Sequence, residues 1–177
     1  IDEYSEARKT LYKPDSNLYS QQLYHFYLAN IYFGVGDFKS ANKHINEIIN
    51  NDISYNNDIT CIAHMMSLLI HFELGKTDLL TSRIKSVYRT LKKRDCMVEV
   101  IDQVLVFLKN YAKNPSDLVK LKEGLLDLKL KVEANLETDP VQKELLEYFD
   151  LTAWLTSKIE KKTFIEILKR NSDYVLG

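Results

Sequence analysis

Residues 28–41 combine a tight turn with the packing residues of two flanking helices, and they restrict the fold more than any other segment. Gly36 ends one helix and Asp37 begins the next, because glycine adopts the left-handed conformation and aspartate caps a helix N-terminus. The small side chain of Ala29 lets the second helix approach closely. Tyr32 then fills the gap between the two helices. The segment therefore predicts an antiparallel helical hairpin.

The order of residue types in this hairpin resembles the tetratricopeptide repeat. A leucine, a small residue and an aromatic residue precede the turn, and Gly-Asp-aromatic and an alanine follow it: Leu28, Ala29, Tyr32, Gly36, Asp37, Phe38 and Ala41. The resemblance is clearest over residues 23–52. It implies a superhelix of stacked hairpins that binds a protein or peptide, catalyses nothing and needs no cofactor.

The first helix of each tetratricopeptide hairpin lines a concave groove. Alignment on Gly36 and on the next candidate turn glycine, Gly75, places six residues on that inner face: Phe26, Asn30, Phe33, Met65, Leu69 and Phe72. Asn30 matches a position where peptide-binding members of the family often hold a peptide backbone. The lysine and arginine partners of the carboxylate-clamping members are missing, which argues against a C-terminal carboxylate as the ligand.

We expect residues 1–177 to form one all-α domain within a longer chain. The chain has only five glycines and three prolines, and its long segments have helical rather than alternating periodicity. We expect a leading helix and four hairpins, about nine helices in all. They span residues 2–12, 16–33, 38–51, 58–74, 78–94 and 97–112, one helix opened by Pro115, one from Pro140 to about Ile159, and residues 161–170. The stretch 143–159 is also similar to the C-terminal segment of bacterial helical-repeat proteins.

Two other functions stay open. The net charge is only −1, but the helix expected at 78–94 carries a basic surface that suits phosphate groups: Arg83, Lys85, Arg89, Lys92 and Lys93. This surface suggests a nucleic-acid-associated regulator, which we rank below protein binding. The other alternative is a purely structural segment of a longer solenoid.

Cysteine and histidine residues give only a weak signal for a metal site. Cys61, His64 and His71 could share one side of a helix, but a fourth ligand is missing and that helix is apolar almost all round, so core packing is the better interpretation. Two cysteines are too few for a disulfide scaffold, which fits a reducing compartment. Cys96 lies beside a helix start without a neighbouring histidine in sequence. We therefore expect no metal.

The remaining signals point away from catalysis and from membranes. No nucleophile signature, phosphate loop or metalloprotease motif is visible, and no apolar run reaches the roughly 18 residues that a membrane-spanning helix needs. We expect a cytoplasmic protein that is not an enzyme. Six of the eleven tyrosines lie within the first 32 residues and suggest an alternative, N-terminal interaction surface: Tyr4, Tyr12, Tyr19, Tyr24, Tyr27 and Tyr32.

Overall fold

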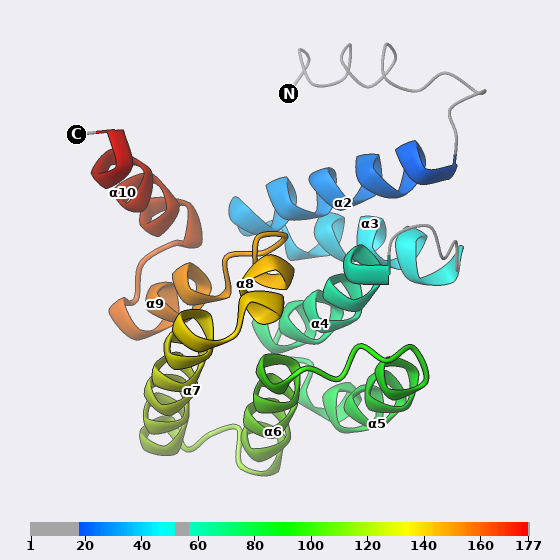
Figure 1. Cartoon of the computed structure of the whole chain (residues 1–177). Coiled ribbons are helices and arrows are strands. Elements are labelled where there is room, and N and C mark those ends of the chain that lie inside the picture. Colours follow the sequence, from blue (N-terminus) through cyan, green and yellow to red (C-terminus); the bar gives the residue numbers. More distant parts are fainter. Residues whose placement is uncertain (1–17, 52–56, 177) are drawn as a thin grey trace.

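The computed structural model describes residues 18–51 and 57–176, and regular structure in these ranges is entirely α-helical (Figure 1). The nine helices in the described ranges are α2 (Leu18–Gly34), α3 (Phe38–Asn50), α4 (Asn57–Glu73), α5 (Thr77–Lys93), α6 (Glu99–Lys113), α7 (Leu118–Thr138), α8 (Pro140–Leu146), α9 (Leu151–Glu160) and α10 (Phe164–Leu176). The all-α prediction is confirmed for this part of the chain. The helix expected at 2–12 lies outside the described residues.

The predicted hairpin at residues 28–41 is present as α2 and α3. Gly36 has a φ of +80°, and the backbone N–H groups of Gly36 and Asp37 donate to the carbonyls of Phe33 and Tyr32, which closes the last turn of α2. Asp37 then caps α3 by accepting the Ser40 N–H at 3.1 Å. Tyr32 stacks on His44 of α3 with ring centroids 5.5 Å apart, as its predicted gap-filling role requires.

The same turn recurs 39 residues later between α4 and α5. Gly75 has a φ of +63°, and the N–H groups of Gly75 and Lys76 donate to the carbonyls of Phe72 and His71. The buried stripe also repeats at this spacing, from Ala41, Ile45 and Ile48 in α3 to Leu80, Ile84 and Val87 in α5. The described chain thus contains a helical-hairpin repeat with a period of 39 residues, longer than the roughly 34 residues of a tetratricopeptide repeat.

Each helix from α2 to α7 packs against the next, and the first helices of successive hairpins also touch, α2 with α4 and α4 with α6. Helix α4 lies in the middle of the described structure, and every residue from Ile59 to Phe72 is buried. Helices α8 and α9 follow α7; in Figure 1, α8 lies near the centre of the structure and α9 beside α7. Tyr148 and Phe149, between α8 and α9, and Trp154 of α9 pack on Phe26, Phe33 and Phe72. The C-terminal part therefore covers the inner side of the hairpins instead of extending the array.

The structure corrects several predicted helix boundaries. The helix expected from Pro140 to Ile159 is broken into α8 and α9, because Phe149 turns into the core and Asp150 starts a new helix by accepting the Ala153 N–H at 2.7 Å. Pro115 lies before α7, whose cap is Asp117. Helix α6 begins at Glu99 instead of residue 97, and Asp95 before it has a left-handed backbone conformation.

Helix α6 obtains a capping group from another helix. Its N-cap residue, Val98, has no side-chain acceptor, and the Oε1 atom of Gln142 in α8 accepts the Val100 N–H at 2.7 Å. The Nε2 atom of Gln142 also donates to the Asp139 carboxylate at 2.8 Å, at the start of its own helix. Its amide group thus ties the start of α8 to the start of α6.

Candidate functional site

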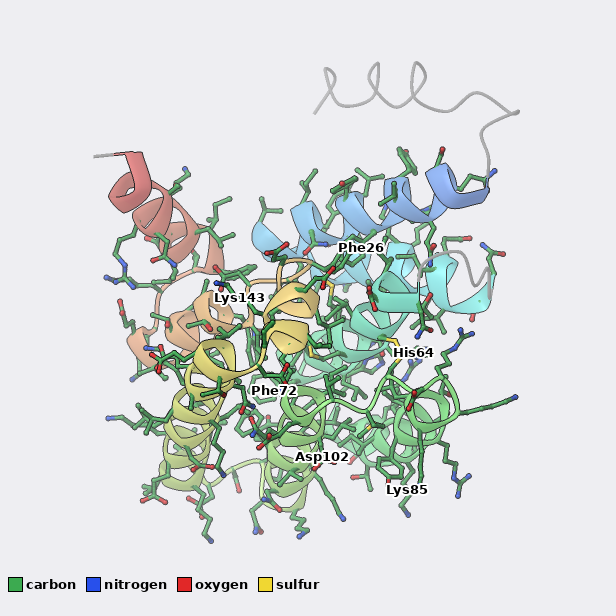
Figure 2. All side chains as sticks on the ribbon, viewed as in Figure 1. Phe26, His64, Phe72, Lys85, Asp102 and Lys143 are labelled. Carbon is green, nitrogen blue, oxygen red and sulfur yellow. A yellow bond between two sulfur atoms is a disulfide. The ribbon has the colours of Figure 1, made fainter. Side chains whose placement is uncertain are left out.

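The six predicted groove residues lie on one side of α2 and α4, but α9 and the turn between α8 and α9 cover that side. Phe26 packs on Tyr148, Phe33 on Phe149, and Phe72 on Trp154, with ring centroids 6.0, 5.2 and 5.7 Å apart. Five of the six are buried, and only Asn30 is partly accessible: the buried five are Phe26, Phe33, Met65, Leu69 and Phe72. Figure 2 labels Phe26 and Phe72. Most of the expected groove is therefore core.

Polar contacts hold this covering layer in place. The indole N–H of Trp154 donates to the Glu73 carboxylate at 2.6 Å, and the Lys158 ammonium lies 2.7 Å from the same oxygen. The Glu73 side chain is 9% exposed, so this pair is largely removed from water. A buried carboxylate needs such partners. Glu73 thus joins the end of α4 to α9.

A hollow remains open at the edge of the inner side, between α2 and α8, and we call it the α2–α8 hollow. Its volume is about 380 Å³, and its lining residues are Leu23, Phe26, Tyr27, Asn30, Glu144, Glu147 and Tyr148. Asn30 donates its amide N–H to the Phe26 carbonyl at 3.0 Å, which leaves its side-chain oxygen as an acceptor. Two predicted groove residues, Phe26 and Asn30, thus line an accessible space.

An apolar flank of α2 continues from this hollow. Tyr27, Ile31 and Val35 are 61%, 47% and 62% exposed and define what we call the α2 flank. Val35 lies in the turn just after α2, where its N–H still donates to the Ile31 carbonyl. Of the three, only Tyr27 belongs to the predicted tyrosine surface. The missed signal was composition: residues 18–34 contain no Asp, Glu, Lys or Arg, although surface helices normally carry charge on their outer face.

A second hollow, of about 390 Å³, lies between α6 and α7. Its apolar lining includes Val106, Phe107 and Leu121, and a side chain at Gly124 would meet the Phe107 ring at 3.2 Å. The lysines along its edge are already paired, Lys120 with Asp117 and Lys131 with Asp127. Glu99 and Asp102 also line it, and neither has an ion pair with another described residue, so the unpaired charge of this hollow is negative.

The predicted basic surface lies on the outer side of α5. Lys85, Arg89, Lys92 and Lys93 are exposed, and no ion pair joins them to another described residue. Arg83 is only half-exposed, and its charge acts on His71. Figure 2 shows Lys85 at the outer edge of the molecule. Tyr88, which is 42% exposed, gives this helix an accessible aromatic ring.

The residues considered for a metal site are used in other ways. Cys61 forms a disulfide with Cys96, with Cα atoms 6.0 Å apart, which corrects the expectation that the cysteines serve only packing. His71 donates its Nδ1–H to the Ser67 carbonyl at 2.6 Å. Burial lowers the pKa of both His64 and His71. Within the described ranges, no three His, Cys, Asp or Glu side chains converge as metal ligands.

Comparison with family models, with curated proteins and with solved structures gives no match to this chain. Among the described residues, no helix is long and apolar enough to cross a membrane. Function therefore has to be inferred from the surfaces that the fold leaves open, chiefly the α2 flank and the α2–α8 hollow.

Proposed function

We propose that this chain is a non-catalytic, protein-binding helical-repeat domain that needs no cofactor. The observation that supports this proposal is a helix without charged residues, α2, whose exposed Tyr27 and Ile31 form one row with exposed Val35 in the turn after it. Exposed apolar patches on soluble proteins often mark interaction sites. Tyrosine suits such a site because it joins a large apolar ring to a hydrogen-bonding tip.

The proposed arrangement is a tetratricopeptide-like superhelix, modified at its C-terminal end. The contacts of α2 with α4 and of α4 with α6, together with the repeated glycine turn, support stacked hairpins. The 39-residue period departs from the family pattern. Because α9 and the turn between α8 and α9 fill the inner side, binding moves to the α2 flank and the α2–α8 hollow.

The disulfide bears on where the protein works. A bond between Cys61 and Cys96 favours an oxidising compartment over the cytoplasm that we expected from the sequence.

The binding proposal is tested by affinity capture followed by rebinding with a purified partner. Partners captured on the wild-type chain are identified, purified and titrated against Ile31→Asp, with exposed Lys109→Ala on α6 as the control. We expect Ile31→Asp to weaken binding at least tenfold and Lys109→Ala to leave it unchanged, with helical circular dichroism retained in both. A partner insensitive to Ile31→Asp would place recognition elsewhere and refute the proposed site.

Nucleic-acid binding through α5 is a second candidate, supported by four exposed cations beside the accessible ring of Tyr88. Four phosphate contacts would give a slope of about −3.6 in a plot of log affinity against log salt for a duplex, and about −2.8 for a single strand. A fluorescent oligonucleotide titrated between 50 and 200 mM salt would test this. Affinity that is unchanged by Arg89→Ala and Lys92→Ala would exclude α5 as the site.

A further inference from the structure

The α2 flank and the α2–α8 hollow form one continuous surface, because Tyr27 belongs to both. The flank is an apolar row with the spacing i, i+4 and i+8, about 12 Å long at 1.5 Å per residue. The hollow is apolar below, where Phe26 lies, and acidic at the edge that α8 supplies. A single partner could therefore contact the row and place one side chain in the hollow.

The shape of the flank suits another helix. Tyr27 and Ile31 occupy the positions of Met66 and Ile70 in α4, 39 residues later, and both of those side chains are completely buried. Helix α4 packs against α2 and α3 as well as against α5 and α6. Within this fold, the cover for such a row is thus a helix, and an i, i+4, i+8 row packs well against an amphipathic one.

The charge at the hollow selects the partner. Glu144 and Glu147 are exposed, and neither carboxylate has an ion pair or hydrogen bond with another described residue. Helix α2 contributes no Lys or Arg, and the nearby Lys143 does not line this hollow but a neighbouring one, to which Glu147 also contributes. Tyrosine faces attract cations as well. A ligand that pairs with these two carboxylates must therefore carry a positive charge.

We propose that this surface docks a basic amphipathic helix of a partner protein. The apolar stripe of the partner lies along Tyr27, Ile31 and Val35, and one of its Lys or Arg side chains enters the hollow between Glu144 and Glu147. The proposal rests on the protein-binding function proposed above and adds the chemical class of the partner.

The test uses the full chain and two fluorescent 18-residue peptides. One has leucine at i, i+3, i+4 and i+7 with lysine on its flanks, and the other has glutamate in place of each lysine. Fluorescence anisotropy at 100 mM salt should show at least tenfold tighter binding of the lysine peptide. The double variant Glu144→Gln/Glu147→Gln should weaken that binding about fivefold or more, and Ile31→Asp at least tenfold.

The matched control is Glu123→Gln/Glu137→Gln, which removes two exposed carboxylates from α7 and should leave the affinity unchanged. Equal binding of both peptides, or equal losses in the two double variants, would overturn the proposal. Wild-type dimers that Ile31→Asp converts to monomers in sedimentation would also overturn it, since a second copy would then cover the flank. If neither peptide binds but the affinity for a purified partner still falls in Ile31→Asp, the partner is not a basic helix. The proposed protein-binding function would then still hold.

Discussion

Helices α2 and α4 occupy the same place in successive hairpins and differ in what covers them. Both have 17 residues, both end at a glycine turn, and both are apolar around most of their circumference. Helix α4 is enclosed from Ile59 to Phe72, whereas Tyr27 and Ile31 of α2 and Val35 just after it are in contact with solvent. A helix that is apolar all round is normally buried. The comparison therefore identifies the α2 flank as a surface that lacks a cover among the described residues.

The largest effects should come from removing the C-terminal cover of the two helices. Trp154 packs on Phe72 at the end of α4, and Phe149 packs on Phe33 at the end of α2. Both covering rings are fully or almost fully buried. Trp154→Ala and Phe149→Ala should each lower the free energy of unfolding by about 3–5 kcal/mol, because a large cavity replaces each ring.

Urea titration measures these losses, with exposed Val141→Ala on α8 as the control, expected within about 0.5 kcal/mol of the wild type. A Trp154 variant as stable as this control would show that α9 does not cover α4 in solution.

The second prediction compares the same repeat position in the two helices, Ile31 in α2 and Ile70 in α4. Ile70→Ala in α4 should cost about 2–5 kcal/mol, since Ile70 is fully buried. Ile31→Ala in α2 should cost no more than about 0.5–1 kcal/mol, since nearly half of its side-chain surface already meets water. Thermal or urea unfolding of both variants gives the difference. Equal losses would mean that another part of the chain or a second copy covers the α2 flank in solution.

A third prediction concerns one repeat position, occupied by Gln22 in α2 and by Cys61 in α4, whose side chain bonds to a residue later in the chain. Gln22 in α2 donates to the Thr60 hydroxyl at 3.0 Å, and 39 residues later Cys61 in α4 is bonded to Cys96. Replacing both cysteines by serine should cost about 2–4 kcal/mol, the range expected for a disulfide that closes a loop of intermediate length. Gln22→Ala should cost about 0.5–1.5 kcal/mol.

Unfolding of the wild type with and without a reductant measures the disulfide contribution independently of substitution. Stability that does not respond to the reductant, with two free thiols counted in the oxidised protein, would show that the two sulfur atoms are not bonded.

Local sequence signals predicted the hairpins well. The turn at Gly36, the cap at Asp37 and the buried stripe of α5 follow from backbone preference and helical periodicity, which involve residues close together in the chain. Boundaries failed where a distant group decides them. The break before Asp150 depends on the place that Phe149 finds against Phe33, and the start of α6 uses a side chain from Gln142.

The candidate site was predicted only in part, for a related reason. Periodicity identifies the apolar side of a helix but not the segment that covers it. The predicted groove residues Phe33 and Phe72 do face one side, yet that side is filled by residues about 80 to 120 positions later in the chain. The pairing of Cys61 with Cys96 likewise depends on how α4 and the loop before α6 come together. The absence of charge from α2 was readable in the sequence and is the signal that would have indicated the α2 flank.

The smallest predicted effect concerns pH and the two histidines of α4. Burial lowers the pKa of His64 below its usual 6.5, and burial followed by the charges of Arg83 and Lys76 lowers the pKa of His71 despite its hydrogen bond. The unfolded chain therefore binds more protons than the folded chain once the pH falls below about 6.5. Stability should be constant above that pH with respect to these two groups and should decrease below it.

The decrease is limited to about 1.4 kcal/mol per pH unit for each histidine, because one proton is at stake in each case. Urea titrations between pH 7.5 and 5 measure it, a range in which the helix-capping carboxylates stay ionised, since hydrogen bonds hold the pKa values of Asp37 and Asp139 below their usual 3.8. The pH slopes of His64→Asn and His71→Asn should each be shallower than the wild-type slope. Slopes equal to the wild-type slope in both variants would show that burial does not keep these two histidines neutral. Helix α4 would then not be enclosed in solution, and it would no longer differ from α2 in this respect.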